Sequence, residues 1–276
     1  IQVFATVHTA FNHPIVVAKQ LATLDQMSGG RLGLNVVAGW NKPEYDAFGM
    51  DLPTDHSDRY AMAQEWFDYV QKLWTADTAF DWDGDFFQGE GVYSLPHPIQ
   101  PKMPIINAAG SEEGRVFAMR NADFLFTPVF DFDQAKATVA DITERAASVK
   151  RNVDVLTLCT VVCRPTQQEA DDYLHWYADE HADWEAVDNL MTLQGMHAQS
   201  FTAEALALYR DRMAAGHGGF PLVGTPDTIA DLLEKLSETG IAGTTLAFVD
   251  YAKEFPYFRQ EVLPRLEAKG LRKPFN

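Results

Sequence analysis

The chain has 276 residues, of which 46% are hydrophobic and 22% charged, a globular composition that excludes wholesale disorder. Its 22 Lys and Arg residues against 39 Asp and Glu residues give a net charge of −17, which argues against nucleic acids and anionic membranes as partners. The sequence holds no run of about 18 apolar residues, so it predicts no helix that spans a membrane. Two cysteines make no disulfide framework, and we expect a reducing, cytoplasmic location.

The first part of the chain alternates strand-like and helical segments. Residues 1–7 predict a strand at the very start of the sequence. Residues 14–27 predict a helix, because apolar side chains recur at helical spacing and two glycines follow its end. The nearly apolar run 32–37 predicts a strand buried on both faces, and residues 58–74 predict an amphipathic helix.

The alternation continues to the end of the chain, apart from two irregular segments. A turn sequence between aromatic residues predicts a small β-hairpin around residues 81–85. Residues 182–222 are rich in His, Met, Gly and Ala, contain one predicted helix at 202–215, and are interpreted as an insertion. The other predicted strands are residues 104–109, 124–127, 153–162 and 243–249. The other predicted helices are residues 112–121, 134–150, 167–181, 225–239 and 253–269.

This pattern gives about six βα units, which predicts a parallel sheet with helices outside it. A (β/α)₈ TIM barrel has eight such units, so we predict a single partial barrel domain over residues 1–276 that lacks the first two units. A strand at residue 1 with no signal peptide before it agrees with a chain cut from a longer protein. An open doubly wound sheet is the alternative, although no Gly-x-Gly-x-x-Gly motif follows any strand.

In such barrels the functional side chains lie at the C-terminal ends of the strands. His8 and His13 follow the first strand, where they could serve as ligands, bases or substrate contacts. The alternatives are a packed polar residue for His8 and a helix start for His13. Asn35 interrupts an apolar strand, and its amide needs a partner in the backbone or in a flat heterocyclic ligand. Gly39 would let a neighbour approach the backbone closely.

Two later segments suit an anion. Arg59, followed by Tyr60, lies near the start of a helix, where the helix itself favours negative charge. Gly110 and Ser111 join a strand to the next helix, where backbone amides and a hydroxyl could hold a phosphate. An exposed Arg–Asp pair and an ordinary Ser cap are the alternatives.

The sequence gives little support to a metal site, and none is predicted. Cys159 and Cys163 share one face of a strand, and two packed core cysteines fit them better than metal ligands. An acidic loop could hold a cation, but a solvated loop is the favoured interpretation. The residues of this loop are Glu44, Asp46, Asp51, Asp55 and His56.

Several motifs along the chain match one family. The most specific stretch covers residues 28–45, from Ser-Gly-Gly-Arg to Lys-Pro-Glu-Tyr. Shorter matches are Ala5-Thr6, residues 22–25, Arg59-Tyr60, the hairpin 84–87, Gly110-Ser111 and residues 122–124. Over essentially the whole chain, the sequence resembles the bacterial luciferase-like flavin-dependent monooxygenases, and within them the branch of the pyrimidine oxygenases and alkanesulfonate monooxygenases.

The resemblance implies a (β/α)₈ fold and an enzyme that uses O₂ and reduced FMN, supplied by a separate NAD(P)H:flavin reductase, to oxygenate a small organic substrate. It also implies a homo-oligomer. Thr6 is expected to contact the flavin ring, His8 to transfer protons at the substrate, and the insertion 182–222 to form a lid. The implied flavin contacts are Asn35, Glu44, Arg59, Tyr60, Gly110 and Ser111.

Residues 7–13 differ from the pattern of the pyrimidine oxygenases, which argues against uracil as the substrate. Three other functions stay open. One is a deazaflavin-dependent oxidoreductase on the same fold. Another is a flavin-binding subunit without catalysis. The last is a metal-dependent hydrolase that uses His8, His13 and the acidic loop.

Overall fold

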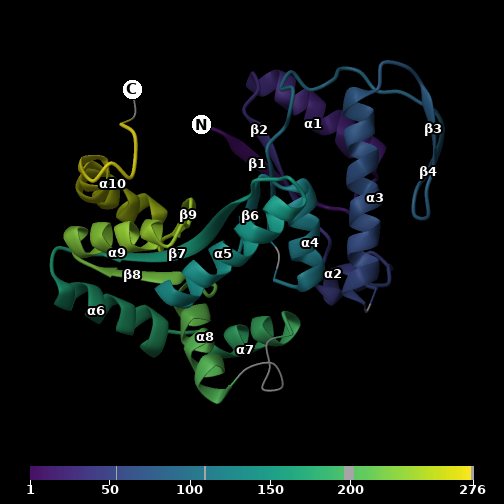
Figure 1. Cartoon of the computed structure of the whole chain (residues 1–276). Coiled ribbons are helices and arrows are strands. Elements are labelled where there is room, and N and C mark those ends of the chain that lie inside the picture. Colours follow the sequence, from purple (N-terminus) through teal and green to yellow (C-terminus); the bar gives the residue numbers. More distant parts are fainter. Residues whose placement is uncertain (54, 109, 196–201, 275–276) are drawn as a thin grey trace. The chain divides into compact units, whose positions relative to one another are not determined.

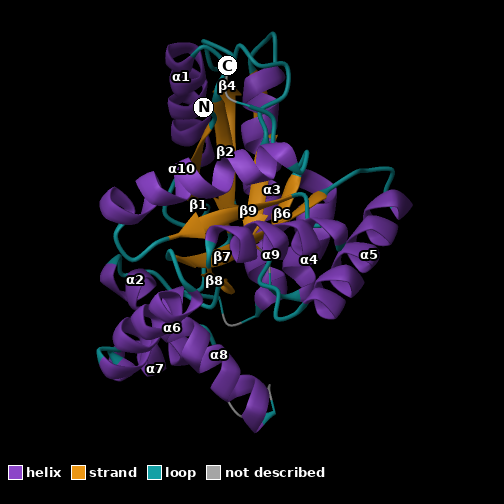
Figure 2. Cartoon of the chain, turned by 90° about the vertical axis from the view of Figure 1, so that its left-hand side faces the viewer, coloured by secondary structure: helices purple, strands orange, loops and turns teal. Residues whose placement is uncertain are grey.

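The computed structural model describes residues 1–53, 55–108, 110–195 and 202–274. The chain divides into two compact units (Figure 1). Unit 1 contains Ile1–Leu125 and Arg145–Val153, and unit 2 contains Phe126–Glu144 and Asp154–Asn276. In each unit helices flank the strands, which Figure 2 colours orange. Within the described ranges, no helix is both long and apolar enough to cross a bilayer.

The strands of unit 1 lie in the order β1 (Val3–His8), β2 (Leu32–Val37), β5 (Ile105–Ala108) and β6 (Phe124–Phe126). β1 and β2 are parallel, as are β2 and β5, and their register places Thr6 opposite Asn35 and Asn35 opposite Ile106. Leu34 and Val36 are fully buried on one face of β2. Because strand side chains alternate, Thr6 and Asn35 share the other face.

Helices α1 (Pro14–Ser28) and α3 (His56–Thr75) pack against each other in unit 1 (Figure 1). Pro14 begins α1 with a preset backbone angle, and Gly29 ends it in the left-handed conformation with φ of 66°. Trp66 and Phe67 of α3 are completely buried in the core of the unit. Two shorter helices complete the unit, α2 (Lys42–Ala47) and α4 (Glu112–Asn121).

Two carboxylates of unit 1 organise loops. Asp25 of α1 is fully buried and accepts hydrogen bonds from the backbone N–H of Ile99 (2.8 Å), the backbone N–H of Gln100 (3.0 Å) and the Gln100 side chain (2.6 Å). Glu65 of α3 accepts two backbone hydrogen bonds, at 2.9 Å each, from residues 86 and 87. These bonds anchor the predicted hairpin, which is the antiparallel pair β3 (Phe80–Asp83) and β4 (Gln88–Val92).

Unit 2 is built around the long strand β7 (Asp154–Cys163), which pairs in parallel with β8 (Phe220–Gly224) and β9 (Gly243–Ala247). Cys159 and Cys163 are free and buried, as predicted, and burial raises the pKa of both thiols to about 11. The helices of the unit are α5 (Phe132–Ser148), whose last turn belongs to unit 1, α6 (Gln167–His175), the π-helix η1 (Trp176–Glu180), α7 (Trp184–Leu193), α8 (Ala203–Gly216), α9 (Pro226–Glu238) and α10 (Tyr251–Ala268).

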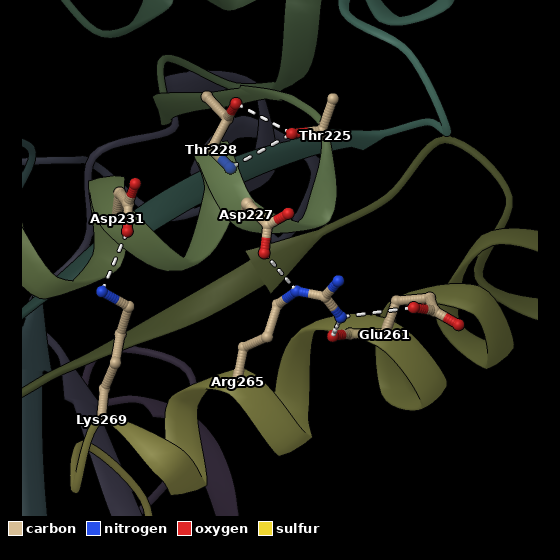
Figure 3. Close-up of polar contacts among 7 residues, drawn as sticks. All are labelled: Thr225, Asp227, Thr228, Asp231, Glu261, Arg265 and Lys269. Carbon is tan, nitrogen blue, oxygen red and sulfur yellow. Dashed lines mark hydrogen bonds and ion pairs between the residues drawn. The ribbon is translucent and has the colours of Figure 1, made fainter.

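Ion pairs join the exposed sides of α9 and α10, as Figure 3 shows. Arg265 donates to Asp227 at 2.6 Å, and the Lys269 ammonium lies 2.9 Å from Asp231. Thr225 caps α9 by accepting from the backbone N–H of Thr228 at 3.3 Å. The side chains in these pairs are partly or largely solvent-exposed, so each pair stabilises the unit by at most about 1 kcal/mol.

All six predicted strands are present in the described ranges, and β8 is one more than the sequence predicted. The range 182–222 also contains more regular structure than expected, because α7 precedes α8 and the first residues of β8 fall inside it. Val187 and Met191 of α7 pack on Tyr209 and Met213 of α8, so the two helices share a small apolar core. Residues 196–201 of the predicted insertion lie outside the described residues. Within the described ranges, the seven strands of the larger sheet are fewer than the eight of a complete barrel.

Candidate active site

Thr6 and Asn35 form the centre of the candidate site, at the C-terminal halves of β1 and β2. The parallel register places them side by side, and the Asn35 amide Nδ2 donates to Thr6 Oγ1 at 3.2 Å. The Asn35 carbonyl Oδ1 is buried and has no hydrogen-bond partner among the described residues. A buried acceptor without a partner costs about 1–3 kcal/mol, so the pair fits a ligand that donates a hydrogen bond to Asn35.

His8 is the last residue of β1 and lies two residues beyond Thr6, on the same face of the strand. Its ring stacks on Phe11, with ring centroids 5.4 Å apart and planes 15° apart. His8 Nδ1 is buried and has no partner in the part of the chain that the structure describes. His13 differs, because its Nδ1 accepts the backbone N–H of Ile15 at 3.3 Å and caps α1, which is the ordinary role that the sequence allowed.

Three further buried polar atoms lack partners at the same ends of the strands, within the described ranges. They are Thr9 Oγ1, Asn41 Oδ1 and Asn107 Oδ1. Asn107 is 1% exposed, and its Nδ2 donates to the Val36 carbonyl at 2.7 Å, while its Oδ1 has no partner in the described residues. We did not select Asn107 from the sequence, although it is an amide within a short apolar strand, the same signal that identified Asn35. Unpartnered polar groups therefore concentrate where barrels of this type bind ligands.

The group that lies close to the backbone of Gly39 is the Tyr45 side chain, and not a ligand. A Cβ atom at residue 39 would lie 2.0 Å from the Tyr45 hydroxyl, and Gly39 has a φ of 105°. The Tyr45 side chain is 1% exposed, and its hydroxyl donates to the Ala38 carbonyl at 3.2 Å. Glu44 precedes it on α2 with an exposed side chain. Tyr45 thus fixes the loop after β2, and Glu44 is left free to meet a ligand.

Arg59 is 7% exposed at the start of α3, which excludes the exposed Arg–Asp pair that the sequence allowed. Its Nη1 donates to the Pro53 carbonyl at 2.7 Å, and no described carboxylate forms an ion pair with it. Because an unpaired buried charge is costly, an anion is the natural partner of this guanidinium. Burial raises the pKa of the neighbouring Tyr60, while the charge of Arg59 acts in the opposite direction. Tyr60 therefore stays a neutral hydrogen-bond donor.

Tyr60, next to Arg59, contacts the middle of α4. Its ring lies 5.7 Å, centroid to centroid, from the ring of Phe117 on α4. Ser111 caps α4 by accepting from the Gly114 backbone N–H at 3.2 Å, and its hydroxyl hydrogen remains available for a second partner. Open space surrounds the α-carbon of Gly110. Glu112 pairs with Arg145, which lowers the pKa of its carboxyl, so this acid is already neutralised.

The site therefore combines a polar pair on the strands with a buried cation and a helix start. FMN has a flat heterocycle with hydrogen-bonding edges and a phosphate, and the unpartnered amide oxygen of Asn35 and the unpaired guanidinium of Arg59 fit these two parts. His8 and the rings of Phe11 and Phe48, whose centroids are 4.8 Å apart, form an aromatic wall beside the polar pair. The whole arrangement lies within unit 1.

Comparison with known proteins identifies the family of the chain. The chain is 32% identical over 271 residues to an FMNH₂-dependent dimethylsulfone monooxygenase of Pseudomonas fluorescens, covering 93% of the chain and 72% of that protein. It is 30% identical to the pyrimidine monooxygenase RutA of Escherichia coli, covering 98% of the chain and 75% of that protein. A crystal structure of riboflavin lyase with modified FMN and riboflavin superposes with a TM-score of 0.87 at 24% identity, covering 99% of this chain and 71% of that one. The family pattern of luciferase-like monooxygenases matches residues 1–243, and the chain belongs to this family.

Proposed function

We propose that the protein is a flavin-dependent monooxygenase that uses reduced FMN and O₂ to oxygenate a small organic substrate. The relatives named above act with FMNH₂ or carry out a monooxygenation, and the chain shares their family. The observation that carries the proposal is the hydrogen-bonded pair of Thr6 and Asn35 with the free Asn35 oxygen, at the ends of two neighbouring parallel strands. An apolar strand has no structural need for this pair.

In this proposal Thr6 and Asn35 contact the flavin ring, and a second group of residues holds the phosphate. Arg59 supplies the charge, and Tyr60 and Ser111 supply hydroxyl donors. Gly110 lets the phosphate approach the backbone amides at the start of α4, because no side chain fills the space beside it. Glu44 lies on the exposed side of the loop after β2 and is proposed to contact the flavin from there.

When bound, reduced FMN supplies the electrons that activate O₂, so that one oxygen atom enters the substrate and the other leaves as water. The protein residues orient the reactants and control water and protons. Asn35 holds the flavin ring through its amide, which Thr6 fixes in one orientation. The stacked rings of Phe11 and Phe48 place apolar surface at this edge of the unit, although Phe48 is 68% exposed. His8 exchanges a proton with the substrate through Nδ1, the ring nitrogen that has no described partner.

Several parts of the proposal concern the protein's surroundings. A separate NAD(P)H:flavin reductase supplies reduced FMN, the enzyme works in the cytoplasm, and the subunits form a homo-oligomer. The segment 182–222, whose described part includes α7 and α8, is proposed to act as a lid.

The test supplies the full-length protein with chemically reduced FMN, reduced deazaflavin or no flavin, under ¹⁸O₂, and follows oxygen incorporation by mass spectrometry. Dimethylsulfone and uracil, the substrates suggested by the relatives, are offered with a panel of uncharged sulfones and thioethers. We expect incorporation of ¹⁸O only with reduced FMN, and not into uracil. Turnover with deazaflavin and no use of O₂ would replace the proposal with a hydride-transfer reaction on the same fold. Flavin binding with no turnover on any compound would favour the non-catalytic subunit.

A further inference from the structure

Unit 1 contains a cavity at the opposite ends of its strands from the candidate flavin site. It lies before the start of β5, has a volume of about 620 Å³, and is large enough for a small organic molecule. Its walls come from the last turns of α3 and α4, the segment before β5, and the hairpin residue Trp82. All of its lining residues belong to unit 1.

Four cationic side chains line this cavity, although the whole chain has only 22 Lys and Arg residues and a net charge of −17. They are Lys72, Lys102, Arg120 and Arg151, and Asp68 is the single carboxylate in the lining. Burial raises the pKa of Asp68, while a hydrogen bond from Gln64 and the charge of Arg120 act in the opposite direction. The cavity is therefore a cationic region on an acidic protein.

The partners of these cations leave two of them unneutralised. Lys102 and Arg151 share one carboxylate, that of Asp123, and Arg151 lies 3.8 Å from it. Lys72 lies over the ring of Phe80 at 5.5 Å, and neither it nor Arg120 forms an ion pair with any carboxylate in the described residues. The ends of α3 and α4 contribute about half a negative charge each. Even with both carboxylates ionised, the four cations remain in excess.

The remaining walls are apolar or aromatic. Met103 and Ile105 are 4% and 2% exposed and form the apolar part of the lining. Trp74 and Trp82 add two half-buried indole rings. One face of Trp82 is covered by Tyr69, with ring centroids 4.5 Å apart and planes 3° apart. The apolar residues, the indole rings and the cationic side chains of this cavity together fit an anion that carries a flat apolar group.

We propose that this cavity binds a small organic anion with an aromatic body, held at its carboxylate or phosphate by Lys72 and Arg120. The site is separate from the candidate flavin site, because its lining shares no residue with the candidate flavin contacts, and its lining residues within 98–103 precede β5 whereas Gly110 and Ser111 follow it. The ligand chemistry is shared by aryl carboxylates and aryl phosphates. The proposal does not depend on the monooxygenase function.

The test is calorimetric titration of the full-length protein with 1-naphthyl phosphate, benzoate, inorganic phosphate and the neutral comparator 1-naphthol. We expect saturable binding of an aryl anion, at least tenfold weaker binding of 1-naphthol, and weak binding of inorganic phosphate. The double variant Lys72→Glu/Arg120→Glu should bind the aryl anion at least tenfold more weakly than the parent protein does. Both side chains are exposed, so the fold should persist, which circular dichroism checks. 1-Naphthoate, titrated in the same way, carries the same ring system as 1-naphthyl phosphate, so the relative affinities of these two ligands identify the anionic group.

Three controls separate this site from others. Lys19→Glu, an exposed change on α1, should leave the affinity unchanged, which shows that net charge alone is not responsible. Lys72→Arg/Arg120→Lys should retain binding because it keeps both charges. Arg59→Ala should also retain it. Loss of binding in Arg59→Ala with retention in the double variant would assign the anion to the flavin site and overturn the proposal, as would equal affinity for 1-naphthol and 1-naphthyl phosphate.

Discussion

Asp25 and Asn35 both place a polar side chain in the interior of unit 1, and their surroundings differ. Asp25 is fully buried and receives three hydrogen bonds from residues 99 and 100. Asn35 makes one hydrogen bond, to Thr6, and its oxygen has no partner in the described part of the chain. Both residues lie in sequence motifs shared with the luciferase-like family. The contrast separates motif residues that hold the fold from those that are available to a ligand.

The same contrast appears along the strands. Before the start of β2, the loop of residues 98–103 is tied to Asp25 and to the Leu32 carbonyl, which Gln100 contacts at 2.8 Å. At or just after the ends of β1, β2 and β5, polar atoms of His8, Asn41 and Asn107 are left unpaired within the described ranges, whereas the unpaired atoms elsewhere in unit 1 include Tyr69 Oη and His97 Nε2. Buried polar groups that serve only stability are normally hydrogen-bonded within the protein. A set of unpaired polar groups at one end of the strands therefore indicates a ligand-binding site.

Asp25→Ala should have the largest effect on stability. It leaves three donors of residues 99 and 100 without their acceptor, which should cost about 3–5 kcal/mol. Asp25→Asn, which keeps one acceptor oxygen, should cost less. The free energy of unfolding in urea, followed by tryptophan fluorescence, measures both. An Asp25→Ala protein as stable as the parent would remove the distinction between the two kinds of polar residue.

His8→Ala should affect catalysis and leave stability nearly unchanged. If Nδ1 exchanges a proton with the substrate, product formation should slow by about 100-fold or more while FMN affinity stays the same. Phe11→Leu is the matched variant, because it removes the ring that stacks on His8 and keeps the imidazole. Its effect should be smaller. If His8→Ala weakened FMN binding by as much as it slowed product formation, His8 would have to contact the flavin.

Asn35→Leu should leave the fold intact, because the volume is similar and the amide oxygen satisfies no donor in the described structure. It should break the coupling between O₂ consumption and product formation, with about a twofold or greater rise in hydrogen peroxide per O₂ consumed. Oxygen-electrode traces and a peroxide assay, run in parallel, give the ratio. An unchanged ratio would show that Asn35 does not face the flavin ring.

Arg265→Ala tests the satisfied polar groups of unit 2, which Figure 3 shows. Its ion pair with Asp227 is at least one-third exposed on each side, so we expect a loss of at most about 1 kcal/mol. The loss should shrink further in 1 M salt, because exposed charges are screened. A salt-independent loss above about 2 kcal/mol would show that surface pairs here contribute as much as buried ones.

The alternation of strands and helices could be predicted from sequence because apolar periodicity reports burial locally. Asn35 stood out for the same reason, as one amide in an apolar run. α7 and β8 could not be recognised, because α7 buries its apolar side against α8, about twenty residues away, and β8 depends on pairing with the end of β7. The burial of Arg59 and the role of Tyr45 beside Gly39 depend on tertiary packing, which local sequence does not encode.

The central claim is that the unpaired polar groups of unit 1 bind FMN, with Arg59 at its phosphate. The most direct test compares the dissociation constants of FMN and riboflavin for the parent protein and for Arg59→Ala by flavin fluorescence. Riboflavin lacks the phosphate, and a charge-assisted hydrogen bond contributes about 1.5–3 kcal/mol. Arg59→Ala should therefore weaken the binding of FMN by about 10- to 100-fold and the binding of riboflavin by less than about twofold. Equal losses for both ligands, or no loss for FMN, would contradict the account.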